Sequence, residues 1–136
     1  MPESSLRTHL RRQLLAHLTA LGYTSNRSKP LGTPAPELRR VNPVRGGIAY
    51  GETVLHSDLH TRRCRERLLF FSRRRTRQRS SILLFIGVDE SDGPALTDLL
   101  KELDIRNGTR GGHVQVVPIA PNSRRTTTAT AAEAQS

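Results

Sequence analysis

The sequence predicts an α/β protein: a three-layer sandwich in which a mixed sheet of about four strands is flanked by three helices. Predicted helices and strands alternate along the chain, which is typical of a sheet covered by helices. Residues 82–88 form a continuous apolar run, the pattern of a central strand buried on both faces. The 136 residues suffice for one domain but not for two. We therefore expect a single α/β domain over residues 1–119.

The first half of the chain predicts a helix, an irregular segment and a hairpin. Leucines at spacings of three and four indicate a helix over residues 5–21, and Gly22 stands where helices commonly end. Residues 23–44 are expected to be loop-like, because their prolines exclude a long helix. A short strand near residues 38–44 would pair with a strand over 47–55 around the turn at Gly46 and Gly47.

The second half predicts two helices and two strands. A helix over residues 58–74, capped by Ser57 or Asp58, precedes a basic loop over 73–81 and the apolar strand 82–88. A helix over 94–103 begins with Pro94 in its first turn, and a last strand covers 113–119. Residues 120–136 are rich in Thr, Ala and Ser and lack bulky apolar side chains, so we expect this tail to be disordered.

Positive charge is the strongest functional indication. Lys and Arg number 22 against 12 acids, which gives a formal net charge of +10. Such an excess attracts polyanions, and the arginine fork matches phosphate oxygens. The arginines that we expect to contact phosphate groups are Arg62, Arg63, Arg65, Arg67, Arg73, Arg74, Arg75, Arg77 and Arg79. The pattern predicts a nucleic-acid-binding protein, with DNA and RNA both open as partners.

A different kind of partner also fits these arginines. They could meet an acidic protein, in which case the chain would be a structural or interaction subunit of a larger assembly. Because Cys64 is the single cysteine, an internal disulfide is impossible, which fits a reducing compartment. No apolar run is long enough to span a bilayer, and residues 1–10 lack the apolar core of a signal peptide. We therefore expect a cytoplasmic protein without a membrane partner.

One stretch carries a family resemblance. The run Tyr50-Gly51-Glu52-Thr53-Val54 lies on a predicted strand after Asn42-Pro43, and a helix and the buried strand 82–88 follow. This order resembles the PD-(D/E)XK nuclease superfamily, which has the restriction-endonuclease-like fold. The resemblance implies a site in which two carboxylates hold Mg²⁺ and a lysine stabilises charge on the phosphorus. On that basis Glu52 is the catalytic candidate, and Glu52 and Asn42 are the candidate metal ligands.

The chain departs from the family motif at two positions. Asn42 and Pro43 stand, in reversed order, where the family has a Pro-Asp step, and Val54 stands at the lysine position. A single carboxylate holds Mg²⁺ poorly, because hard cations need several oxygen ligands. We therefore expect a nuclease-like fold without catalytic activity and without a cofactor. A Mg²⁺-dependent nuclease remains the alternative enzyme.

Two smaller clusters have alternative interpretations. His56, Asp58 and His60, with Cys64 one helical turn later, could hold zinc, although capping and solvent-facing roles are more common at a helix start. The acids after the central strand, Asp89 and its neighbours, are interpreted as capping residues of the next helix.

Overall fold

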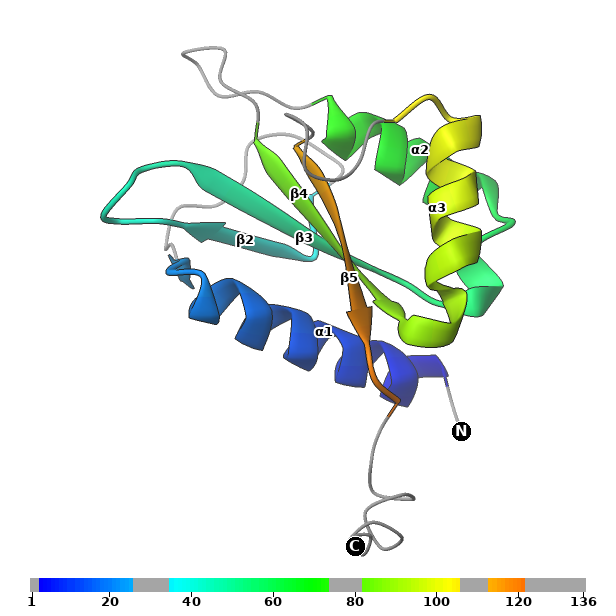
Figure 1. The fold of residues 1–136 in the computed structure, drawn as a ribbon, viewed down its shortest axis with the longest axis horizontal. Helices are drawn as coiled ribbons and strands as arrows, with labels where there is room; N and C mark the ends of the chain where they lie inside the picture. The colour runs from blue at the N-terminus through cyan, green and yellow to red at the C-terminus, as the bar shows by residue number, and fades with distance from the viewer. Residues whose placement is uncertain (1–2, 26–34, 74–81, 106–112, 122–136) are drawn as a thin grey trace, which may run out of the picture.

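The computed structural model describes residues 3–25, 35–73, 82–105 and 113–121. These residues form one mixed sheet and three α-helices (Figure 1). The predicted α/β class is confirmed. The expected basic loop, apart from Arg73, and nearly all of the expected tail lie outside the described residues.

Helix α1 (Glu3–Ala20) forms because its leucines recur on one stripe. Leu10, Leu14 and Leu18 are buried. The helix ends at Gly22, which adopts φ +98°, and the next residue donates its N–H to the carbonyl of Leu18. Only glycine takes this left-handed conformation without strain, so Gly22 stops the helix as predicted.

Helix α2 (Arg62–Ser72) begins later than expected. The 3-10 turn η1 (His56–Asp58) comes first, and the Thr61 hydroxyl caps α2 by accepting the N–H of Cys64. The expected cap at Ser57 or Asp58 is therefore wrong, because the Asp58 carboxylate instead accepts the N–H of Leu55. A side chain that caps at this turn is not available to cap the later helix.

Helix α3 (Gly93–Glu102) agrees closely with the prediction. Pro94 lies in its first turn, where its missing N–H has no cost, and Leu96, Leu99 and Leu100 are buried. The short turn η2 (Glu90–Asp92) precedes it, and the Asp89 carboxylate accepts the N–H of Ser91. Asp89 therefore caps the turn η2 rather than α3, and Asp92, the N-cap residue of α3, makes no side-chain capping hydrogen bond.

The sheet has five strands rather than about four. In spatial order they are β1 (Thr24–Ser25), β2 (Leu38–Val41), β3 (Ile48–Val54), β4 (Leu83–Asp89) and β5 (Val114–Ile119). β1, β2 and β3 pair antiparallel, whereas β3, β4 and β5 pair parallel. The additional strand is β1, only two residues long, in the segment that was expected to be loop.

The helices cover both faces of this sheet and give the predicted three layers. Helix α1 lies on one face, and α2 and α3 lie on the other (Figure 1). The alternation of side chains along β4 explains this arrangement: Phe85 packs in the cluster with α1, whereas Leu84, Ile86 and Val88 pack with α2 and α3. The central strand is buried on both faces, as its apolar run indicated.

The β2–β3 hairpin determines which side chains meet at the carboxyl end of β3. Asn42 accepts the N–H groups of Val44 and Arg45 with its side chain, which orders the turn. The register pairs Leu38 with Gly51, so Glu37, just before β2, comes opposite Glu52 of β3. No helix of the described residues is long and apolar enough to cross a membrane.

Candidate functional site: an arginine-lined pocket

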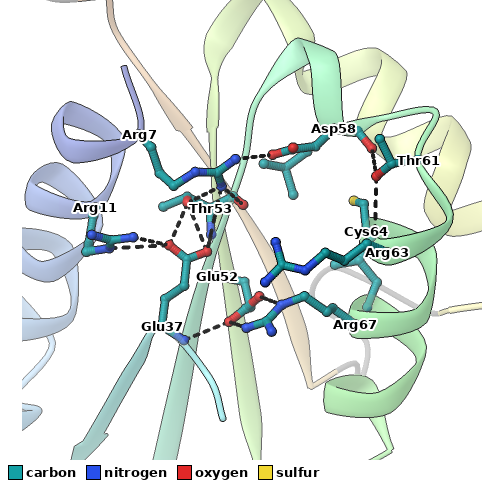
Figure 2. A pocket seen from close by; sticks show the side chains of 12 residues that line it. Arg7, Arg11, Glu37, Glu52, Thr53, Asp58, Thr61, Arg63, Cys64 and Arg67 are labelled. Carbon is teal, nitrogen blue, oxygen red and sulfur yellow. Dashed lines mark hydrogen bonds and ion pairs between the residues drawn. The ribbon is translucent and has the colours of Figure 1, made fainter. Parts of the chain in front are cut away.

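A pocket of about 190 Å³ lies at the carboxyl end of β3, between α1 and the first turns of α2 (Figure 2). Its apolar lining comes from Val54, Cys64 and Leu68. Its charged lining comes from four arginines and three carboxylates, namely Arg7, Arg11, Arg63, Arg67, Glu37, Glu52 and Asp58. With every group ionised, the lining carries one net positive charge.

Glu52 and Arg67 form the buried ion pair of this pocket. Arg67 donates from Nε to Oε1 at 2.8 Å and from Nη2 to Oε2 at 2.9 Å, so the contact is bidentate. The two side chains are 4% and 18% exposed. The ring of Phe71, 5.1 Å from the guanidinium carbon, holds Arg67 from the other side.

The pair shifts both pKa values. Burial raises the pKa of Glu52, and the hydrogen bonds from Arg67 and from the Glu37 N–H offset only part of that rise. The hydrogen bond to Glu52 raises the pKa of Arg67, so the guanidinium stays charged. Arg67 therefore stabilises the ionised form of Glu52 in this buried position.

Glu37 is the second carboxylate of the pocket, and sequence reasoning missed it. Its side chain accepts the N–H of Thr53 at 2.8 Å and the guanidinium Nη2 of Arg11 at 2.9 Å. Thr53 lies beyond the part of β3 that pairs with β2, whose last paired residue is Gly51. The carboxylate of Glu37 therefore accepts the Thr53 N–H in place of a strand carbonyl. Pairing the two predicted strands around the turn at Gly46 and Gly47 would have placed Glu37 at the end of the hairpin, opposite Glu52.

Arg7 links three elements at the rim of the pocket. It donates to the carbonyl and hydroxyl oxygens of Thr53 on β3 and, at 2.8 Å, to the carboxylate of Asp58 in η1. Asp58 is held in turn by the N–H of Leu55. The N-terminal turns of α1 are thereby fastened to the end of the sheet.

Arg63 differs from the other arginines of the pocket. Its side chain is exposed, and it makes no hydrogen bond or ion pair with any described residue. Figure 2 shows it extending from α2 across the space between Arg7 and Arg67. Arg63 and Arg67 are four residues apart and share one face of α2, as the sequence predicted.

The structure separates the other arginines expected to contact phosphate. Arg62 is 89% exposed and lies 3.9 Å from Glu66, whereas Arg65 pairs with Glu102 of α3. Arg73 is exposed at the end of α2. The remaining arginines, Arg74, Arg75, Arg77 and Arg79, lie outside the described residues.

The candidate metal ligands Glu52 and Asn42 are not brought together. Asn42 lies opposite Gly47, at the other end of the hairpin, about 16 Å from Glu52 along β3. The structure therefore does not bring the two expected ligands together. Nor do Glu52 and Glu37 fit Mg²⁺, because their oxygens already accept from Arg67, Arg11 and backbone N–H groups.

The possible zinc cluster is also dispersed. His56 pairs with Asp92 of η2, and Asp58 pairs with Arg7, whereas His60 is exposed. Within residues 3–25, 35–73, 82–105 and 113–121, no three His, Cys, Asp or Glu side chains are grouped as a metal site.

Cys64 is buried beside the carboxylates, and we expect it to be unreactive while the protein is folded. Burial, reinforced by the charges of Asp58 and Glu52, raises the pKa of its thiol from 9.0 to about 11. The thiolate is the reactive form, so at pH 8 its population falls about a hundredfold relative to an unperturbed thiol. Iodoacetamide should label the native protein at least that much more slowly than the urea-unfolded chain. Equal labelling rates in the native and unfolded protein would contradict the buried position of Cys64.

The fold and the pocket define an α/β protein with an arginine-rich, partly buried charged site at the end of its third strand. Comparison with protein-family models, with curated proteins and with solved structures finds no match to this chain.

Proposed function

We propose that this protein binds nucleic acid through its phosphate groups and does not cleave it. The observation that carries the proposal is Arg63, an exposed guanidinium that crosses the pocket and has no partner among the described residues. The three carboxylates of the pocket balance the other three arginines, so the charge of Arg63 is left without a counter-charge among the described residues, and a phosphate group would supply one. The net positive charge of the lining matches an anionic ligand.

Exposed arginines elsewhere on α2 support a contact longer than one phosphate. Arg63 and Arg73 lie ten residues apart on or at the end of the helix, which corresponds to about 15 Å. Phosphates a few nucleotides apart on one strand could therefore meet both ends of α2. Binding would release condensed counterions, which makes the affinity steeply dependent on salt.

We further propose that the fold is restriction-endonuclease-like and that its site is catalytically degenerate. The position of Glu37 beside Glu52 supports the first statement, because the family motif places two carboxylates on paired strands. Two features support the second. Val54 occupies the lysine position, and arginines engage both carboxylates where a metal ion would need free oxygens.

The test is binding of labelled duplex and single-stranded oligonucleotides, followed by fluorescence anisotropy at two salt concentrations, with and without Mg²⁺. We expect binding that weakens steeply with salt, without cleavage. Arg63→Gln should reduce the slope of log affinity against log salt by roughly 0.7–0.9, the loss of one phosphate contact. Arg12→Gln is the matched control, because Arg12 is an exposed helical arginine outside the pocket.

Three other outcomes would contradict the proposal. An unchanged slope in Arg63→Gln would remove the pocket from the contact surface. Mg²⁺-dependent cleavage that is lost in Glu52→Gln would establish the nuclease alternative. Absence of binding at moderate salt would leave the arginines as a surface for an acidic protein partner.

A further inference from the structure

The accessibility of the arginines restricts the ligand that can enter the pocket. Arg63 is exposed at the rim, but the side chains of Arg7 and Arg67 are only 28% and 18% exposed. A ligand that meets all three must protrude into the space beside β3. The space of about 190 Å³ is large enough for a phosphate group.

A phosphate within a strand is poorly suited to this space. It is flanked by two sugars and has only two non-bridging oxygens, so it presents fewer oxygens and less charge to Arg63, Arg7 and Arg67. A terminal phosphate is bonded to one sugar and presents three oxygens to its surroundings. At pH 7 it carries a charge of about −1.5 to −2, which a cluster of guanidinium groups favours over the single charge of a diester.

We propose that the pocket receives the terminal phosphomonoester of a nucleic-acid strand, with Arg63 as the arginine that closes on it. The inference rests on the proposed nucleic-acid binding and adds its chemical specificity. Arg7 and Arg67 are already fixed by Asp58 and Glu52, so they are held in place before a ligand arrives. Pre-organised donors spend little conformational entropy on binding. Arg63, free of partners among the described residues, supplies the charge that the bound carboxylates do not neutralise.

The experiment compares one single-stranded 12-mer in three forms, with a 5′-phosphate, with a 3′-phosphate and with hydroxyl groups at both ends. Affinities are measured by anisotropy at one ionic strength. We expect at least one phosphorylated form to bind about tenfold more tightly than the hydroxyl form, the effect of one added charge-assisted contact. Arg63→Gln should abolish the preference, whereas Arg12→Gln should preserve it. Because Arg63 is exposed and makes no hydrogen bond or ion pair with the described residues, its substitution leaves the core packing intact.

Competition identifies the source of the phosphate. Inorganic phosphate should displace the phosphorylated 12-mer more effectively than sulfate at equal ionic strength, and in Arg63→Gln the two anions should be equivalent. Equal affinities for all three oligonucleotides would overturn this inference and leave general nucleic-acid binding in place. No binding of any oligonucleotide would overturn both, even if inorganic phosphate alone binds.

Discussion

Replacing Arg67 with methionine is expected to destabilise the protein by about 3–5 kcal/mol at pH 7. The change leaves the Glu52 carboxylate 4% exposed and without its bidentate partner. Methionine preserves most of the apolar contact with Phe71, so the loss is mainly electrostatic. Urea unfolding measures the effect as a lower midpoint with an unchanged dependence on denaturant.

The deficit of Arg67→Met should depend on pH in a defined direction. Burial already holds the pKa of Glu52 above its ordinary value, and removal of Arg67 raises it further. A carboxyl group whose folded-state pKa exceeds its unfolded value favours folding when protonated, so stability is lost as pH rises through the folded pKa. The difference from wild type should therefore be larger at pH 7.5 than at pH 5. Equal deficits at both pH values would show that Glu52 is not left as an unpaired carboxylate.

A second substitution serves as the control for this experiment. Glu52→Gln combined with Arg67→Met removes both charges, and the double variant should recover a large part of the stability that Arg67→Met loses. If the stability losses of Glu52→Gln and Arg67→Met simply add in the double variant, the two side chains act independently. The broken ion pair is then not the cause of the stability that Arg67→Met loses.

Replacing Glu37 with alanine is expected to cost about 2–4 kcal/mol. The Thr53 N–H, buried at the end of β3, would lose its acceptor, and Arg11 would lose its ion pair. An unsatisfied buried N–H costs about 1–3 kcal/mol, and hydrogen bonds to charged groups are stronger than neutral ones. Circular dichroism followed during thermal unfolding should show the loss as a lower Tm.

The matched control for Glu37→Ala is Glu66→Ala. Glu66 is 69% exposed and lies 3.9 Å from Arg62, so its removal should change stability by less than about 0.5 kcal/mol. Similar losses in both variants would mean that Glu37 does not act as the acceptor that completes β3.

Local patterns were sufficient to predict most of the elements. Leu10, Leu14 and Leu18 lie on the buried stripe of α1, and the apolar run over residues 82–88 overlaps the doubly covered strand β4. Gly22 ends α1, and the turn at Gly46-Gly47 joins β2 to β3. These outcomes depend on periods of a few residues and on backbone preferences, both of which can be read along the chain.

The site could be predicted only in part. Glu52, Arg63 and Arg67 were named from the sequence, and the structure places all three in one pocket. Glu37 was not named, and Asn42 was named as the second ligand instead, because the position of the second carboxylate depends on hairpin register rather than on spacing. The role of these residues in binding nucleic acid stays a prediction.

By itself, the sequence determined the α/β class, the approximate position of each helix and of four strands, and the basic charge. Tertiary structure alone decided which charges meet. Arg67 reaches Glu52 across 15 positions of the chain, Glu37 reaches Thr53 across 16, and Arg7 reaches Asp58 across 51. Such contacts follow from strand pairing and from helix packing on a sheet. Periodicity constrains one element at a time, so it cannot specify which arginine of the pocket is left without a partner among the described residues.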